Sequence, residues 1–389
     1  MRRDGSSRPA VTVLLTCTMA FSMLQLFLLG AFGPRLVAEL GVSRTALGLT
    51  TTAGFGLAAL LSPVAGRLVD RLGPRRSTVA LLLITAVALG LIGAAPGTAV
   101  LFLAVALGGV PQALANPATN KAVLACFPPE RRAPVLGWKQ SGVQFGAFLA
   151  GLPLTLLAAG AGWRGAVWTA AAAALLAAGW AAAVLPPDPP PAPDAPKLPP
   201  GRVVGRLAAF SLLLGCGVAS VNTYLALFGT QRLGLSATVA ALPVAVLGVA
   251  GVVGRVGWSR AAGRPGRAER LPALLAAGAV GAALLFAAAG PLPALVWVGA
   301  VAVGVFAVSA NAVSMVLVMQ RSEPGRAGQD SALVAAGFFA GFAVGPALFG
   351  LLVSAAGYGP GWLLVAVEFA GAALVAAPPA LRRARVSVA

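Results

Sequence analysis

The amino-acid sequence predicts an all-α membrane protein whose twelve transmembrane helices form two pseudo-symmetric six-helix bundles. Hydrophobic residues make up 59% of the 389 residues and charged residues only 10%, which is more apolar surface than a soluble domain can bury. Twelve apolar runs have the length of about twenty residues that one membrane crossing requires. The last six runs repeat features of the first six at a nearly constant spacing.

The spans follow one another with short polar connections. The first six are expected at 10–32, 45–65, 77–95, 98–124, 134–159 and 164–185, and the second six at 206–229, 237–258, 271–289, 292–319, 330–355 and 361–380. An apolar stretch after N-terminal arginines can also indicate a cleaved signal peptide. The first stretch is too long for the apolar region of such a peptide, so we expect an uncleaved span.

A proline-rich segment separates the two halves. Residues 186–200 read Pro-Pro-Asp-Pro-Pro-Pro-Ala-Pro-Asp-Ala-Pro-Lys-Leu-Pro-Pro, a composition that stays extended and solvated as a semi-rigid spacer. The expected organisation is therefore an N-terminal six-helix bundle at 1–185, a cytoplasmic linker at 186–205 and a C-terminal six-helix bundle at 206–389.

Several short motifs occur once in each half. Leu-Gly-Val-Ser at 40–43 returns as Leu-Gly-Leu-Ser at 233–236, and the serine is expected to cap the helix that follows. Small residues four positions apart allow helices to approach closely. Further pairs lie 188 to 195 residues apart: Gly66-Arg67 with Gly254-Arg255, Asn116 with Asn311, and Gly142 and Gly146 with Gly337 and Gly341. We therefore predict a duplication of six spans, with Asn116 and Asn311 at equivalent depth.

The charge distribution indicates orientation. The net charge is +18, but the arginines lie in short loops between apolar runs rather than along one face, so no nucleic-acid partner is expected. Most of the 28 basic residues fall at the termini, in the linker and in the loops after spans 2, 4, 8 and 10. By the positive-inside rule these parts, including both termini, are expected on the cytoplasmic side of the cell membrane.

Composition also excludes several kinds of chemistry. The sequence has no histidine, which rules out histidine-based metal sites, catalytic triads and histidine proton relays. Cys17, Cys126 and Cys216 lie within or at the ends of apolar runs and form neither a metal-binding pattern nor a disulfide framework. We expect no metal, no cofactor and no catalytic residue.

The loop at 66–76 carries the most specific motif. Its pattern G-x-L-x-D-R-x-G-x-R-R resembles the loop between the second and third helices of the major facilitator superfamily of secondary transporters. The alternative is a basic anchor that any multi-pass membrane protein can carry. The resemblance implies a gating motif formed by Gly66, Asp70, Arg71, Gly73 and Arg75.

In that family the aspartate packs against the start of span 11, here 329–331. The partial positive charge of a helix N-terminus stabilises a carboxylate there by about 0.3–1 kcal/mol. The contact holds the halves together on the cytoplasmic side and breaks when the transporter opens inward. In the second copy Trp258 stands where the aspartate would be, so the corresponding latch is expected to be weaker or built differently.

Polar residues within spans are the candidates for substrate binding, since each is costly in hydrocarbon unless it faces protein or water. The resemblance implies that spans 4 and 10, which carry Asn116 and Asn311, line a central cavity, and Pro117 is expected to kink span 4. The alternative is that both asparagines hydrogen-bond across helix interfaces. The candidates are Gln25, Asn116, Asn120, Lys139, Gln140, Gln144, Asn222, Tyr224 and Asn311.

Lys139 is the candidate that favours an anionic substrate. It lies early in span 5, in the run Trp-Lys-Gln-Ser-Gly-Val-Gln-Phe-Gly, which resembles the fifth helix of cyanate-permease-type and related anion carriers. We predict that it faces the cavity together with Gln140, Gln144 and Asn116. The alternative is that the ammonium, about 8 Å past the expected helix start, snorkels to the cytoplasmic interface.

Glu368 is the candidate for proton coupling, because it is a carboxylate within a span. The alternative, which the expected boundaries favour slightly, is a hydrated position near the outer end of span 12.

Drug antiporters of the superfamily carry a Gly-Pro ending in the fifth helix and an arginine in the fourth. Here Ala147 follows Gly146, and Ala104 and Val105 stand where the arginine would fall, which argues against proton-coupled drug efflux.

The sequence therefore predicts a monomeric secondary transporter that moves a small organic solute, with an anion favoured, by alternating access with protons or a counter-ion. Efflux of hydrophobic compounds is the second hypothesis. A membrane-embedded enzyme is disfavoured because acid–base groups within the spans are scarce. A sensor that has lost transport has the same sequence features as a transporter.

Overall fold

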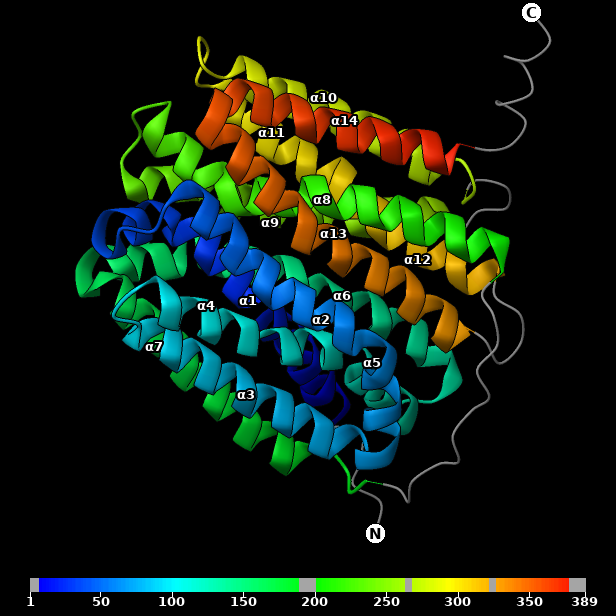
Figure 1. Ribbon diagram of the computed structural model, residues 1–389. Helices are drawn as coiled ribbons and strands as arrows, with labels where there is room; N and C mark the ends of the chain where they lie inside the picture. The colour runs from blue at the N-terminus through cyan, green and yellow to red at the C-terminus, as the bar shows by residue number, and fades with distance from the viewer. Residues whose placement is uncertain (1–6, 189–200, 263–267, 322–326, 378–389) are drawn as a thin grey trace, which may run out of the picture.

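The computed structural model describes residues 7–188, 201–262, 268–321 and 327–377 (Figure 1), and these ranges contain helices and no strand. The first half consists of α1 (Ser7–Leu40), α2 (Arg44–Leu72), α3 (Pro74–Ala94), α4 (Thr98–Leu107), α5 (Gly109–Cys126), α6 (Pro129–Gly151) and α7 (Pro153–Val184). The second half consists of α8 (Arg202–Gln231), α9 (Ala237–Ala262), α10 (Leu271–Ala288), α11 (Leu295–Ala302), the π-helix η1 (Val303–Val308), α12 (Ser309–Arg321), α13 (Ala327–Ala356) and α14 (Tyr358–Ala376).

The two halves lie side by side. Figure 1 shows α3 and α7 on the outer flank of the first half, and α10 and α14 on the outer flank of the second. Between the flanks, α2 packs against α13, α6 against α9 and α1 against α8. An all-α protein of membrane-spanning helices is therefore confirmed, and these three helix pairs make the most extensive contacts between its halves.

Span 5 is broken in the middle, and its first part is polar. It begins as α6, breaks at Leu152 and continues into α7 as far as Gly162, whose φ of 74° reverses the chain into span 6. Eleven described helices are long and apolar enough to cross a membrane. The helix α6 is outside this count because charged residues fill its first turn and Lys139 and two glutamines follow. A helix of this composition needs protein around it.

Spans 4 and 10 are both interrupted, and at related positions. Span 4 breaks at Gly108, between α4 and α5, and span 10 changes to π-helical geometry from Val303. The spacing between these positions is the same as that between Asn116 and Asn311. The repeat deduced from the sequence thus extends to an irregularity of the backbone.

The predicted serine caps are present in both halves. The Ser43 hydroxyl accepts a hydrogen bond from the Ala46 amide at 3.0 Å, and the Ser236 hydroxyl accepts one from the Val239 amide at 3.4 Å. The glycine two residues before each serine has a φ of 63° or 68°, which explains why glycine recurs in both motifs. These two caps were therefore readable from the sequence, whereas several helices extend beyond the expected spans, α1 to Leu40 and α2 to Leu72.

Glycines bring the helices into backbone contact, as predicted. A Cβ atom on Gly142 of α6 would overlap the Thr16 carbonyl of α1, and one on Gly337 of α13 would overlap the Ala208 carbonyl of α8. Both pairs occupy corresponding places in the two halves. Side chains larger than hydrogen would force these helices apart.

This packing predicts the effect of adding one methyl group. We expect Gly142→Ala to destabilise the protein by about 1–3 kcal/mol through overpacking and to lower its melting temperature in detergent. Gly137→Ala in the same helix is the control, because a Cβ there meets nothing within 4 Å and alanine improves helix propensity by about 1 kcal/mol. Equal melting temperatures for the two variants would contradict the close contact of α6 with α1.

Candidate functional site

Lys139 is buried inside the first half. Its side chain is 2% exposed, and its ammonium donates to the Thr119 hydroxyl at 2.8 Å and to the Asn116 side-chain oxygen at 3.3 Å. The Thr119 hydroxyl hydrogen is directed to the Ala115 carbonyl at 2.6 Å, which leaves its oxygen free to accept from Lys139. The structure thus brings Lys139 and Asn116 together, as the sequence predicted.

The alternative position for Lys139, at the membrane interface, is not what the structure shows. The helix α6 begins at Pro129, five residues before the expected start of span 5. Lys139 therefore lies about 15 Å along the helix rather than about 8 Å. Its side chain points to α5 instead of to the end of the bundle.

The charge of Lys139 has no counter-charge near it. Both hydrogen-bond partners are neutral, and no carboxylate among the described residues lies within 4.0 Å of the ammonium. An ammonium at the centre of a membrane costs about 2.5–3.5 kcal/mol on insertion scales. Such a group is retained where it meets an anion or a water-filled path.

A second cation reaches the same helix from the other half. Arg255 of α9 is 7% exposed, and its guanidinium donates to the Gln140 backbone carbonyl of α6 at 3.1 Å. Gly251 and Gly248, one and two turns earlier in α9, allow this approach, because a Cβ on Gly251 would meet the Gln144 side chain and one on Gly248 the Gln144 backbone. Arg255 thus crosses the contact between the halves one residue from Lys139.

Sequence reasoning missed Arg255 as a site residue. The repeat aligned it with Arg67, which lies in the exposed motif region, and so assigned it to the basic loop after span 8. The boundary expected for that span, 237–258, in fact placed it inside the membrane. A charged residue within an expected span was the sequence feature that could have identified Arg255.

Several buried polar atoms near this contact have no hydrogen-bond partner among the described residues. They are Gln144 Oε1 of α6, Arg255 Nε of α9 and Asn311 Oδ1 of α12. Buried polar groups are nearly always satisfied, so such a group points to water or a ligand. Together with Asn116, Thr119 and Lys139, these residues form what we call the polar cluster.

The polar cluster draws on both halves. Its α5 and α6 residues are joined by the Lys139 hydrogen bonds, and α9 packs on α6 and on α12. A Cβ atom on Gly254 would lie 2.6 Å from the Ser309 hydroxyl of α12, two residues before Asn311. Spans 4, 5, 8 and 10 therefore contribute to one region.

Other predicted site residues lie elsewhere. The Gln25 amide donates to the Val105 carbonyl at 3.3 Å and packs on Gly108, so it holds α1 against the break in span 4. Asn222 donates to a carbonyl of its own helix at 2.8 Å. Asn120 is exposed, and Gln140 is half-buried and contributes its backbone carbonyl.

Tyr224 belongs to a seal at the end of the bundle opposite the 66–76 loop. Its hydroxyl contacts the Arg44 carbonyl at 2.6 Å and the Pro346 carbonyl at 3.1 Å, which links α8 with α2 and α13. The Arg44 guanidinium also donates to the Gln231 side chain at 2.8 Å, and the Thr45 hydroxyl lies 3.2 Å from that of Ser354. At this end the two halves are held together by direct contacts.

Glu368 is buried rather than hydrated. It lies in the middle of α14, its side chain is 7% exposed, and its Oε2 atom has no hydrogen-bond partner among the described residues. The expectation of a hydrated position near the outer end of span 12 is therefore wrong, because α14 packs this face against its neighbours α8 and α10. Glu368 is on the flank of the second half.

In the gating motif, Asp70 forms an ion pair with Lys121. The carboxylate is 2.8 Å from the ammonium and 54% exposed, and the pair ties the end of α2 to the end of α5. Gly66 is half-buried and Arg71 is exposed. The approach of Asp70 to 329–331 stays a prediction, and the side chain of Gln329 lies outside the described residues.

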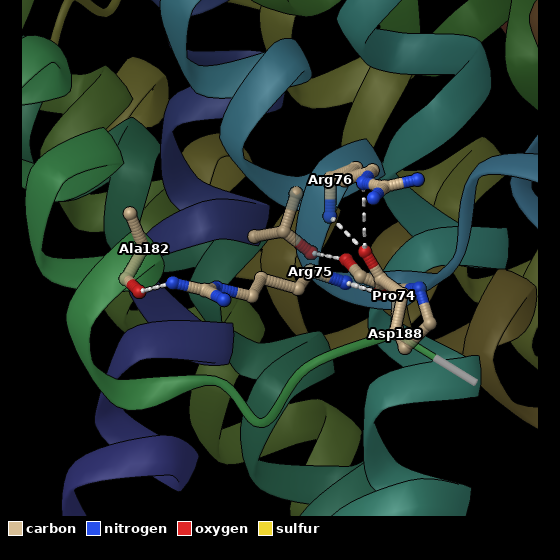
Figure 2. Close-up of polar contacts among 6 residues, drawn as sticks. Pro74, Arg75, Arg76, Ala182 and Asp188 are labelled. Atoms are coloured by element: carbon tan, nitrogen blue, oxygen red, sulfur yellow. Dashed lines mark hydrogen bonds and ion pairs between the residues drawn. The ribbon is translucent and has the colours of Figure 1, made fainter.

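Gly73 and Arg75 hold α3 to the end of α7. Figure 2 shows the Asp188 carboxylate at the start of α3, where it accepts from the Arg75 amide at 2.7 Å and the Arg76 amide at 3.0 Å. The Arg75 guanidinium donates to the Ala182 carbonyl. A Cβ on Gly73 would overlap the Asp188 side chain. Asp188, assigned to the linker by its proline-rich surroundings, is thus a helix cap within the first half.

This cap predicts graded effects on stability. We expect Asp188→Ala to cost about 1–2 kcal/mol, because two amides of α3 lose their acceptor, and Asp188→Asn to cost less because one acceptor oxygen remains. Thermal unfolding of the purified protein measures both. Identical losses for alanine and asparagine would show that the carboxylate does not act by hydrogen bonding.

Comparisons with known proteins agree with this architecture. Residues 15–332 match the model of the Major Facilitator Superfamily, and the chain belongs to this family. Its fold is similar to a bacterial homologue of the human lysosomal transporter Spinster in an inward-facing, occupied conformation, with a TM-score of 0.77, 15% identity and 96% of each chain covered. The inward-facing, unoccupied form of that homologue is similar with a TM-score of 0.70 and 17% identity, over 96% of this chain and 94% of that one.

A mutant of the nucleoside transporter NupG is similar to the same degree, with a TM-score of 0.76 at 15% identity over 94% of this chain and 98% of that one. At such identities the likeness establishes the fold alone. No curated protein sequence matches the chain. The protein is thus a multi-pass membrane protein and a secondary transporter rather than an enzyme.

Proposed function

We propose that this transporter carries a small organic anion across the cell membrane by alternating access, as a monomer with both termini in the cytoplasm. The observation that carries the proposal is the buried ammonium of Lys139, which has only neutral partners. An anion that binds beside it supplies the missing counter-charge. The excess of basic residues in the loops on one side supports the orientation.

The arrangement of the halves suits alternating access. The contacts of Tyr224 and Arg44 join the halves at one end of the bundle, whereas Asp70 is exposed and paired within its own half at the other. The polar cluster lies on the helices that meet between these ends. A cargo bound there interacts with both halves, and a rocking movement of the halves exposes it to either side.

Substitution of Lys139 tests the proposal. In reconstituted vesicles supplied with labelled organic anions, we expect Lys139→Ala to abolish uptake and Lys139→Arg to retain part of it, since the charge is kept and the geometry changed. Arg131→Ala, which removes an exposed arginine from the first turn of the same helix, serves as the control for altered charge. Equal uptake by the wild type and Lys139→Ala at equal amounts of protein would instead favour a neutral or hydrophobic cargo, as in the efflux hypothesis.

We further propose that Glu368 carries the proton that couples transport to a gradient. A buried carboxyl oxygen without a partner is stable when the group is neutral, and losing the proton requires α14 to open to water. Glu368→Gln is isosteric and fixes the neutral form. We expect it to eliminate the stimulation of uptake by an imposed proton gradient while leaving exchange of cargo across the membrane. Unchanged stimulation would assign coupling to another group or ion.

A further inference from the structure

Arg255 is the one residue of the second half whose charge is buried at the polar cluster, among the residues that the structure describes. Its single hydrogen bond goes to a backbone carbonyl, Gln140, and its Nε hydrogen has no partner. A guanidinium binds carboxylates through two parallel hydrogen bonds, which a single carbonyl cannot provide. The observed contact leaves most of the binding capacity of this side chain unused.

The two cations at the cluster leave a charge of +2 to be compensated. Lys139 belongs to α6, Arg255 donates to the backbone carbonyl of the next residue in that helix, and no carboxylate among the described residues lies within 4.0 Å of either cation. Buried charges are tolerated when they are paired. A cargo with one negative charge leaves the second cation uncompensated, whereas a cargo with two compensates both.

We propose that Arg255 is a second cargo-binding residue and that the cargo is a small dianion of the dicarboxylate class, held between Lys139 of the first half and Arg255 of the second. This rests on the proposed function, anion transport, and narrows its substrate class. One carboxylate replaces the neutral hydrogen-bond partners of Lys139. The other accepts hydrogen bonds from the Arg255 guanidinium, which no longer donates to the Gln140 carbonyl.

Such a cargo links binding to movement. A ligand shifts a conformational equilibrium only through contacts that differ between the states. The Arg255 bond to Gln140 joins the halves directly in this conformation. A dianion that replaces this bond by its own contacts releases α9 from α6 while it bridges the halves itself. Binding of a monoanion at Lys139 leaves the bond in place.

The experiment compares dicarboxylates of two to six carbons with monocarboxylates of the same length, as stabilisers of the purified protein in thermal unfolding and as labelled substrates in vesicles. We expect dicarboxylates to bind more tightly than their monoanionic partners in the wild type. In Arg255→Ala the affinity for the dianion should fall about tenfold or more, while that for the monoanion changes little. Arg255→Lys should restore part of the loss.

The control is Arg260→Ala, which removes an exposed arginine from the same helix and should leave both affinities unchanged. The melting temperature without ligand separates misfolding of a variant from loss of binding. Equal affinity of the wild type for dianions and monoanions, or an unaltered dianion affinity in Arg255→Ala, overturns this inference and leaves anion transport through Lys139 standing. If neither dicarboxylates nor monocarboxylates bind, the proposed function is overturned as well.

Discussion

The structure depends on enclosing one helix that lipid cannot surround. The helix α6 carries Lys139 and Gln144 in the middle of a membrane protein, and exposing these groups to hydrocarbon would cost several kcal/mol. Three neighbours therefore cover it: α1 through the backbone contacts of Gly142, α5 through the Lys139 hydrogen bonds, and α9 through Gly251. Because α9 belongs to the other half, the requirement to enclose α6 also joins the halves.

The two copies of the repeated Gly-Arg motif differ in where their charges lie. In the first copy Asp70 pairs with Lys121 at the end of the bundle, and Arg67 is exposed. In the second copy no aspartate occupies the corresponding position, and Arg255 is buried against α6 instead. At this motif the first copy thus keeps its arginine at the surface, and the second has its arginine buried.

Much of the fold could be predicted from one-dimensional patterns. Hydrophobic length gave the spans, the Leu-Gly-x-Ser motifs gave two helix caps, and glycine spacing gave the close helix pairs, because each depends on residues near one another in the chain. The pair of Lys139 with Asn116 was predicted because both are polar and at similar depth. Depth along a helix is readable from the sequence, whereas the direction a side chain faces is set by packing.

That difference explains the residues that sequence reasoning misjudged. Gln25 and Tyr224 are polar and inside spans, as cargo-binding residues are, but their partners are backbone carbonyls on other helices. Asp188 is surrounded by prolines, and only the fold reveals that α3 begins beside it. The burial of Glu368 is not visible in the sequence, because the helices that pack on α14 are distant in the chain.

The π-helical stretch from Val303 to Val308 gives span 10 a rotational freedom that a regular helix lacks. A π-turn holds one more residue than an α-turn, so converting it to α-helical hydrogen bonding turns everything beyond it by one residue, about 100°, around the helix axis. In α12 that rotation would carry Asn311 away from its present face and bring a neighbouring side chain to the position it leaves. Whether Asn311 or a neighbouring residue occupies this position therefore depends on whether this one turn is π-helical or α-helical.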